Sequence, residues 1–297
     1  MRLQYRYIRF LIILSGVLIS VALSAQSIPS GPLSIPVYHP LVLNPAYVGS
    51  KDYTNVSFTT RTLKNWDQQL IHAHKRLSAS NGSFSNFGVG GYTFLEQTDD
   101  AWNTGLSLAS AYHHSLDEAR IHTLSGGISL KGIIEIPKTP EESSGDSLNS
   151  SFSPDLDLGA YYYGPSAFGG LSVTSVASPS RHFHVYGGYK FLLSRSQAIV
   201  LEPSLLVSLN DSTFSEAHKQ ITPYLKLYLQ NFYIGTYMKS LDLFALFFQY
   251  QFPRLYAGVF LEFPRIGYLN DDNIIFEVSV GVNLGSGGTP HLQYGHW

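Results

Sequence analysis

The sequence predicts an all-β protein: a transmembrane antiparallel β-barrel of the outer-membrane type, with about 14 strands in a range of roughly 12–16. Charged residues make up only 13% of the chain, about half of the roughly 25% found in soluble domains. Aromatic residues are abundant, with 20 Tyr and 18 Phe, while the mean hydropathy is near zero. Apolar residues recur with a period of two, and no segment after the N-terminus is long and apolar enough for a spanning helix. These features suit a barrel with lipid outside and water inside.

The N-terminus has the order of a secretory signal peptide. Residues 1–9 carry three arginines and no acid, residues 10–23 are apolar, and the small residues Ser24 and Ala25 follow. A membrane anchor is the alternative, but the apolar run is shorter than the roughly 20 residues that a spanning helix needs. We therefore expect export and cleavage after Ser24 or Ala25, which assigns residues 1–25 to the signal peptide.

The clearest strand is 276–284, in which Phe276, Val278 and Val280 share one face while Glu277 and Ser279 share the other. The same alternation marks fourteen segments, near 54–62, 71–79, 84–95, 101–113, 119–132, 155–163, 166–176, 182–192, 197–209, 219–229, 232–239, 243–251, 256–264 and 274–284. Together they predict a barrel over residues 53–285.

The two strand faces should meet different surroundings. We expect the apolar face to meet lipid and the small or polar face to line the lumen. Glycines on the second face, as in 87–91 and 187–188, suit a crowded interior or a strand bend. The aromatic runs Tyr161 to Tyr163 and Phe247 to Phe248 are expected to belong to the girdles at the membrane interfaces.

Turn residues separate the predicted strands, at 81–82, 210–212, 231 and 269–273. One connection is long: residues 137–154 are rich in Pro, Ser and acids and predict a solvated extracellular loop. Residues 286–297 form a C-terminal tail in which Pro290 argues against a regular strand.

Residues 26–52 are predicted to be a periplasmic lead-in to the barrel. Pro36, Pro40 and Pro45 predict an extended, non-sheet course over 28–47, because proline disfavours helix at the residue before it. The apolar anchors of this segment are Tyr38, Leu41, Leu43 and Tyr47. We favour a structural clasp that closes the bottom of the barrel; a plug or a partner-contacting segment at the periplasmic mouth is the alternative.

The lead-in also carries a family resemblance. Residues 38–50 contain Asn44-Pro45-Ala46-Tyr47 followed by Gly49-Ser50, which resembles the N-terminal signature of the PorP/SprF family, with Val48 in place of a small Ala. Further similar elements follow in family order, at Arg61 with Trp66, at 155–173, at 184–194 and at 201–207.

This resemblance implies an outer-membrane barrel component of the type IX secretion system, serving protein secretion and gliding motility. The implied partners are a peptidoglycan-associated lipoprotein of the machine and large secreted surface adhesins, and the family is not known for enzymes. The partner-binding candidates are the matched residues, Tyr38, Asn44, Pro45, Ala46, Tyr47 and Gly49. An outer-membrane channel, either a porin or a transporter of hydrophobic substrates, is the second reading.

Other chemistry finds little support in the sequence. The absence of Cys excludes disulfides and thiolate sites, and no Gly-x-Ser-x-Gly elbow, phosphate-binding loop or dinucleotide-binding pattern occurs, so we expect no enzyme and no cofactor. The near-neutral charge gives no sign of nucleic-acid binding. The pairs His72/His74 and His182/His184 would each share a strand face and could hold a metal, but we favour polar lumen or rim residues. Asp155 and Asp157 could hold calcium, but we favour a solvated acidic mouth.

Overall fold

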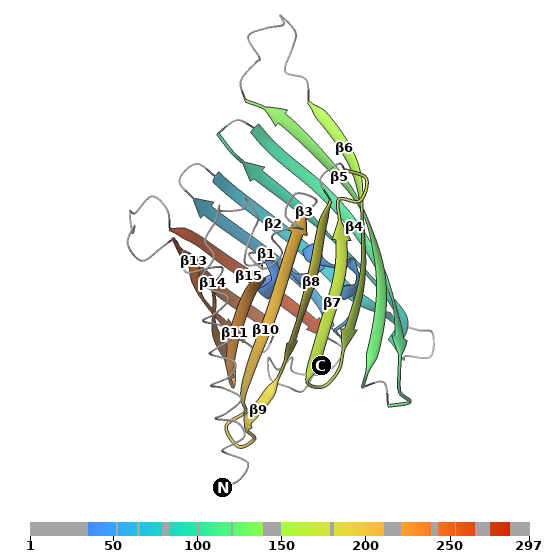
Figure 1. Ribbon diagram of the computed structural model, residues 1–297, viewed down its shortest axis with the longest axis vertical. Coiled ribbons are helices and arrows are strands. Elements are labelled where there is room, and N and C mark those ends of the chain that lie inside the picture. The colour runs from blue at the N-terminus through green and yellow to red at the C-terminus, as the bar shows by residue number, and fades with distance from the viewer. Residues whose placement is uncertain are drawn as a thin grey trace, which may run out of the picture.

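Fifteen strands form one antiparallel sheet that closes on itself into a barrel (Figure 1). The computed structural model describes residues 35–51, 53–63, 66–78, 84–99, 101–119, 121–138, 150–178, 181–210, 221–238, 243–252, 254–264 and 274–285. The predicted signal peptide and C-terminal tail lie outside these ranges.

The strands follow one another around the barrel in chain order. Their bounds are β1 (Tyr53–Leu63), β2 (Trp66–Ser78), β3 (Phe84–Gln97), β4 (Ala101–Ser115), β5 (Thr123–Pro137), β6 (Ser151–Tyr163), β7 (Ala167–Thr174), β8 (His182–Tyr189), β9 (Phe191–Ser194), β10 (Ile199–Asn210), β11 (Ile221–Leu229), β12 (Phe232–Met238), β13 (Leu243–Gln251), β14 (Leu255–Pro264) and β15 (Ile275–Gly285). Strand β15 pairs with β1 and β10 pairs with β11, so the ring is closed. Strands β8 and β9 are interrupted at Lys190 and both pair with β10, so they fill one place in the wall. The barrel thus has fourteen strand positions, and the predicted fold class is confirmed.

Each of the fourteen predicted segments overlaps a strand, but the predicted 137–154 loop is too long. Strand β5 continues to Pro137 and β6 already begins at Ser151, with Glu135 opposite Ser151. Pro154 lies inside β6, in a stretch that pairs with a strand only on the β5 side, because pairing with β7 begins at Leu158. An edge position tolerates proline since no ladder bond is lost there. The β5–β6 hairpin therefore rises beyond its neighbours, as Figure 1 shows at the top.

The two ends of the barrel differ in the length of their connections. Tyr53 and Gly285 are paired at one end, where no connection between strands is longer than seven residues. The three longest connections, which are 138–150, 211–220 and 265–274, all lie at the other end. In outer-membrane barrels the short turns face the periplasm and the long loops face outward. The end at Tyr53 is accordingly the periplasmic end.

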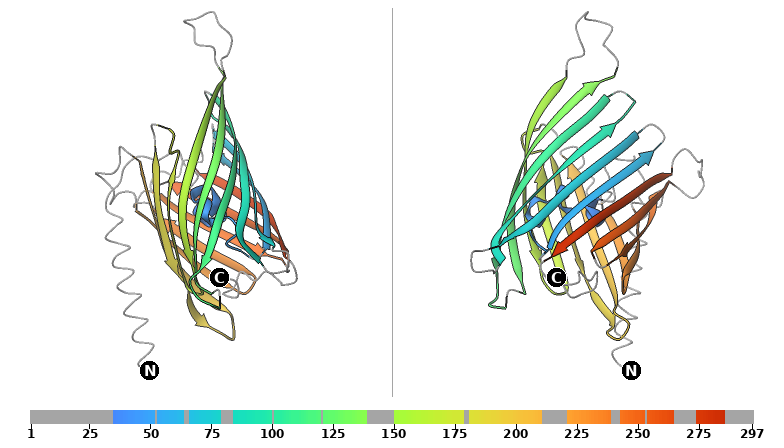
Figure 2. Two further views of the ribbon diagram at one scale, coloured as in Figure 1. Left: turned by 90° about the vertical axis from the view of Figure 1, so that its right-hand side faces the viewer. Right: turned by 180° about the vertical axis from the view of Figure 1, so that it is seen from behind.

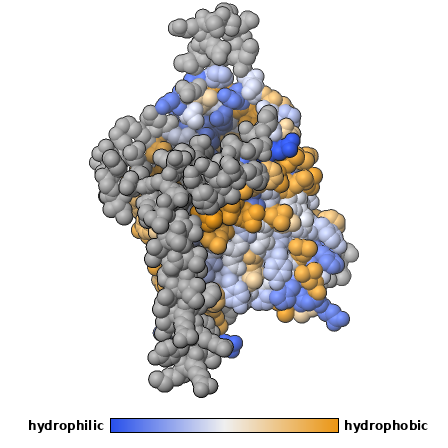
Figure 3. Space-filling model, in the orientation of Figure 1, coloured by the Kyte–Doolittle hydropathy of each residue, from blue (hydrophilic) through white to orange (hydrophobic). Residues whose placement is uncertain are grey.

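The outer surface is apolar, as the alternation predicts. On β15, Val280 is 43% exposed while its neighbour Ser279 is fully buried in the interior, and on β4 Leu108 is 63% exposed while Ser107 is buried. In Figure 3, hydrophobic residues gather around mid-height of the visible face, with hydrophilic residues above and below. This distribution matches the apolar band of a membrane barrel.

The aromatic runs do not belong wholly to girdles. Tyr161 and Tyr163 are 6% and 7% exposed, and Phe247 is 3% exposed, so all three are interior residues. Phe248, at 41%, faces outward. Consecutive strand residues point to opposite faces, so a run of aromatics must divide between lumen and lipid.

No helix among the described residues is long and apolar enough to cross a membrane.

Candidate functional site: the segment that crosses the lumen

The chain from Ile35 to Lys51, which we call the lead-in, folds into three short helical turns inside the barrel. They are α2 (Ile35–Tyr38), α3 (Pro40–Leu43) and η1 (Pro45–Tyr47), and both views of Figure 2 show this blue segment within the ring of strands. The expected extended course is therefore wrong for residues 35–47. Within residues 35–47, His39 and Asn44, which precede Pro40 and Pro45, are the residues that depart from helical geometry. Each proline occupies the first turn of the next helix, where its missing N–H costs no hydrogen bond.

Tyr38 attaches the start of the lead-in to strands β13 and β14. Its hydroxyl lies 3.2 Å from the carbonyl oxygen of Phe248 and 3.0 Å from that of Val259, and it can donate to either. The ring packs edge-on against Phe260, with 6.4 Å between ring centroids. The hydroxyl thus bonds to the wall itself rather than pointing into open space.

Asn44 attaches the middle of the lead-in to the opposite part of the wall. Its Nδ2 donates to the carbonyl oxygens of Ala160 on β6 at 2.9 Å and of Leu171 on β7 at 3.3 Å. Its Oδ1 accepts from the backbone N–H of Ala46 at 2.9 Å, which caps η1. A side chain on Gly159 would collide with Asn44, since a Cβ there would lie 2.0 Å from Oδ1. The amide therefore fits only because the wall is bare of side chains at that point.

The end of the lead-in contacts β3, β4 and β5. Ser125 Oγ donates to the carbonyl oxygen of Ala46 at 2.8 Å, and His113 Nε2 lies 2.7 Å from the carbonyl oxygen of Val48. Gly49 has a φ of +77°, which favours glycine, and lies against Gly88 of β3. Together with Tyr38 and Asn44, these contacts show that the lead-in crosses the lumen from wall to wall.

A chain of buried hydrogen bonds ties His39 to β1 and β2. His39 Nδ1 lies 2.7 Å from His72 Nδ1, and His39 Nε2 lies 2.6 Å from Thr59 Oγ1. His72 Nε2 lies 2.7 Å from Asn55 Oδ1, which can only accept, so Nε2 carries the proton. Of the two facing Nδ1 atoms, one donates and the other accepts, so His39 and His72 share one proton between them.

The six partner-binding candidates are all in the lead-in, and the structure places them in the interior. Tyr38, Asn44, Pro45, Ala46 and Gly49 are buried against the wall, and Tyr47 is half-buried. The expected anchors Leu41 and Leu43 are also buried. In this arrangement the Asn-Pro-Ala-Tyr block contacts the barrel rather than the surroundings.

Sequence reasoning missed His39 and His113, whose contacts depend on which strands the lead-in reaches. A signal for the contact surface did exist, in the glycines on the lumen face. A Cβ at Gly88, Gly127 or Gly159 would lie within 2.5 Å of a lead-in atom. Of the glycines that the sequence singled out, Gly88 therefore lies in a crowded interior, and the crowding there comes from the lead-in.

On the periplasmic side of the lead-in the lumen retains a cavity of about 210 Å³. Several of its lining residues stand within the first or last two positions of strands at the short-turn end, namely Tyr53, Tyr228, Tyr233, Gln251 and Tyr256. Tyr38 and Tyr47 of the lead-in line it as well. Most of the cavity is thus bounded by the lead-in and by the periplasmic halves of the strands, and Leu206 and Tyr224 extend it into the outer halves of β10 and β11.

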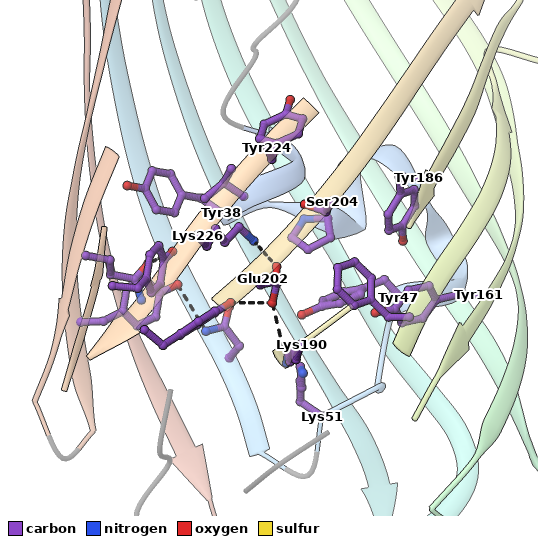
Figure 4. A pocket seen from close by; sticks show the side chains of 18 of the residues that line it. Tyr38, Tyr47, Lys51, Tyr161, Tyr186, Lys190, Glu202, Ser204, Tyr224 and Lys226 are labelled. Atoms are coloured by element: carbon purple, nitrogen blue, oxygen red, sulfur yellow. Dashed lines mark hydrogen bonds and ion pairs between the residues drawn. The ribbon is translucent and has the colours of Figure 1, made fainter. Parts of the chain in front are cut away.

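Glu202 is the centre of a charged cluster in this cavity (Figure 4). Its side chain is buried, with Lys226 Nζ at 3.1 Å from Oε1 and Lys190 Nζ at 3.9 Å from Oε2. Tyr228 donates its hydroxyl to Oε2 at 2.9 Å. One carboxylate therefore faces two ammonium groups.

The other polar clusters are explained by pairing inside the wall. His184 Nδ1 lies 3.0 Å from Ser208 Oγ, and the ring stacks on His182. Lys131 Nζ lies 3.0 Å from Asp157 Oδ1 and 4.0 Å from Asp155 Oδ2. Asp157 is buried, so the expected solvated acidic mouth is wrong at this residue, because a lysine on the neighbouring strand neutralises it. Within the described ranges, no group of three or more His, Cys, Asp or Glu side chains is arranged to hold a metal ion.

Comparison with known proteins gives one family. Residues 37–282 match the sequence model of the family described as type IX secretion system membrane protein PorP/SprF. No curated protein matches the chain.

Among solved structures, the outer membrane protein Omp33 of Acinetobacter baumannii is 9% identical with a TM-score of 0.48, over 80% of this chain and 100% of that one. The KdgM porin is 11% identical with a TM-score of 0.39, over 78% and 99%. BamA from Haemophilus ducreyi, lacking POTRA domains 1–3, is 10% identical with a TM-score of 0.42, over 79% and 70%.

Proposed function

Because the chain belongs to the PorP/SprF family of type IX secretion system membrane proteins, we propose that it serves that system as a closed outer-membrane barrel that holds partner proteins. The partners are a peptidoglycan-associated lipoprotein on the periplasmic side and a secreted surface adhesin on the outer side. Its role would lie in protein secretion and gliding motility. The family is one of membrane proteins of a secretion machine rather than of enzymes.

The observation that carries this proposal is the course of the lead-in across the lumen. Displacing it would expose Leu41, Leu43 and Val48, which are buried, at about 1.5–3 kcal/mol each if they met water. The hydrogen bonds of Tyr38 and Asn44 would be lost as well. These contacts support a holding role over the alternative of an open channel, which needs a wet lumen from end to end.

The β5–β6 hairpin supports an extracellular partner. Residues 151–157 of β6 have no partner on β7, and Phe152 among them is 66% exposed. A large apolar side chain at this height, next to the connection 138–150, offers a surface to a secreted protein.

The six residues of the lead-in would act on the periplasmic partner through the position of the lead-in. Asn44, Pro45, Ala46 and Gly49 would fix it to the wall. Tyr38 and Tyr47 would shape the periplasmic cavity that both of them line.

Conductance in planar bilayers separates the holding role from the channel. The closed barrel should give no steady ion current, whereas a porin would conduct continuously. A steady current carried by the folded wild-type protein would contradict the proposal.

Co-purification from detergent extracts, read by mass spectrometry, tests the partners. Tyr47→Ala should reduce lipoprotein recovery and leave adhesin recovery largely intact. Deletion of residues 140–149 should do the reverse, and deletion of 213–218 in another long connection is the matched control. If the folded variants recover both partners at wild-type levels, neither segment is a docking determinant.

We also propose that the signal peptide is removed after Ser24 or Ala25. The mass of the intact protein purified from outer membranes should then begin at residue 25 or 26. A mass that includes residues 1–24 would contradict cleavage.

A further inference from the structure

The periplasmic cavity carries an excess of positive charge. Among the described residues that line it are Lys51, Lys190 and Lys226, against one carboxylate, Glu202. The histidines in the lining, His72 and His74, are counted as neutral, because burial disfavours a charged imidazole. Because a net charge inside a barrel is poorly solvated, an anion that enters the cavity gains Coulomb energy that it would not gain in bulk water.

Tyrosine dominates the rest of the lining. Nine of the described residues that line the cavity are Tyr, out of 20 Tyr in the chain. Tyr47, Tyr161 and Tyr186 form a row, with 5.6 Å and 5.8 Å between successive ring centroids (Figure 4). A tyrosine offers an apolar face beside a hydroxyl that both donates and accepts. A sugar ring has the complementary surface, because its C–H groups can lie on an aromatic face while its hydroxyls reach the phenols.

The barrel wall offers a ligand few free backbone hydrogen-bonding groups. Every strand that contributes to the cavity is paired on both sides, since the ring of strands is closed. Extended peptides are usually recognised through main-chain hydrogen bonds at a free strand edge. In this cavity the backbone amides of a peptide could form hydrogen bonds only with side chains. A sugar forms its hydrogen bonds through hydroxyl groups, which side chains can satisfy.

The size of the cavity limits the ligand. A volume of about 210 Å³ lies below the roughly 300–1,000 Å³ of pockets that hold drug-sized molecules. One ring fits this space better than a chain of rings.

We propose that the periplasmic cavity binds a single sugar ring that carries a carboxylate, either a uronic acid or an acidic amino sugar. Lys190 and Lys226 supply the positive charge that selects the carboxylate. The row Tyr47, Tyr161 and Tyr186 contacts the face of the ring.

Isothermal titration calorimetry on the full-length protein in detergent tests this site. The acidic probes are glucuronate and N-acetylmuramate, and their neutral counterparts are glucose and N-acetylglucosamine. Acetate and triglutamate test a bare carboxylate and an acidic peptide. We expect an acidic sugar to bind at least tenfold more tightly than its neutral counterpart and than acetate, with affinity falling as salt is raised. The stronger of the two acidic probes identifies the source of the ligand.

Substitutions locate the binding. Lys226→Gln and Lys190→Gln should each weaken binding of the acidic sugar at least tenfold, while Lys75→Gln, at an exposed position of β2, should not. Heat-dependent migration on gels identifies the folded variants, and the two cavity variants are independent should one fail to fold. The proposal is overturned if glucose or acetate binds as tightly as glucuronate and N-acetylmuramate, if triglutamate binds more tightly, or if the cavity variants behave as Lys75→Gln does.

Discussion

Gly127 and Gly126 are neighbours on β5 that should respond oppositely to the same added methyl group. A Cβ at Gly127 would lie 2.4 Å from the backbone nitrogen of Ala46 and 2.5 Å from its Cα. A Cβ at Gly126 would meet nothing within 4 Å. The reason is the alternation of strand faces, since Gly127 faces the lead-in and Gly126 faces outward.

The magnitude follows from the overlap. Ordinary van der Waals contact begins near 3.4 Å, so Gly127→Ala forces the lead-in and β5 about 1 Å apart. The closest atoms are backbone, so no rotation of a side chain relieves the clash. Such overpacking costs about 1–3 kcal/mol. Gly126→Ala should stay within about 0.5 kcal/mol of wild type, or gain slightly through the lower entropy of the unfolded chain.

Denaturant unfolding in lipid vesicles, followed by tryptophan fluorescence, measures both variants. Planar-bilayer recordings of the same samples should show a leak for Gly127→Ala and none for Gly126→Ala, because a displaced lead-in opens the lumen. If the two variants agree within 0.5 kcal/mol and neither leaks, then the lead-in does not pack on Gly127 and the proposed closure of the lumen loses its support.

Three further changes test other parts of the structure. Val280→Arg places a charge on the lipid face and should cost about 2–4 kcal/mol near the bilayer midplane, while Val280→Leu should stay near wild type. Equal unfolding midpoints for the two variants would mean that the strand faces are assigned wrongly. Glu202→Gln removes the carboxylate that Lys190 and Lys226 share, whose side chains are 19% and 13% exposed, and should cost about 3 kcal/mol. A loss under 0.5 kcal/mol in the same unfolding assay would show that the ion cluster is not needed for folding. In the 116–122 turn, the backbone N–H groups of His122 and Ile121 hold the pKa of Asp117 below its usual 3.8. Because the pKa of Asp117 is lower in the folded state, its stabilisation is complete above the ordinary pKa and is lost as the pH falls through the folded pKa. The stability advantage of wild type over Asp117→Asn should therefore shrink as the pH is lowered from 7 into that acidic range. A difference in stability that stays constant with pH would contradict the assignment.

The lumen face shows what the alternation of apolar and polar residues can predict and what it cannot. It predicts correctly that Val280 points outward and Ser279 inward. It also suggests that an arginine at Ser279 would be mild in a wet lumen. The structure contradicts that expectation, because Ser279 is fully buried and its Oγ accepts a hydrogen bond from Thr59. A period of two distinguishes inside from outside, but it carries no information about what fills the inside.

The Asn-Pro-Ala-Tyr block shows the same limit in the lead-in. Its prolines restrict the local backbone, and the resemblance to a secretion family rests on its residues, which the family match confirms. Whether the block is a clasp below the barrel or a plug within it depends on distant partners. Asn44 bonds to Ala160 and Leu171, more than a hundred residues away, and no local rule contains that contact.

By itself the sequence determined the class of fold, the fourteen strand positions, the outward face and the family. These follow from local alternation, turn residues and a short motif, and all of them are encoded by near neighbours in the chain. Only the tertiary structure decided that the lead-in crosses the lumen and that Glu202 gathers Lys190 and Lys226. Closure of the barrel sets which strands face each other across the lumen. Contacts across the lumen depend on the strand register and the curvature of the whole ring, and the sequence of a single segment does not encode them.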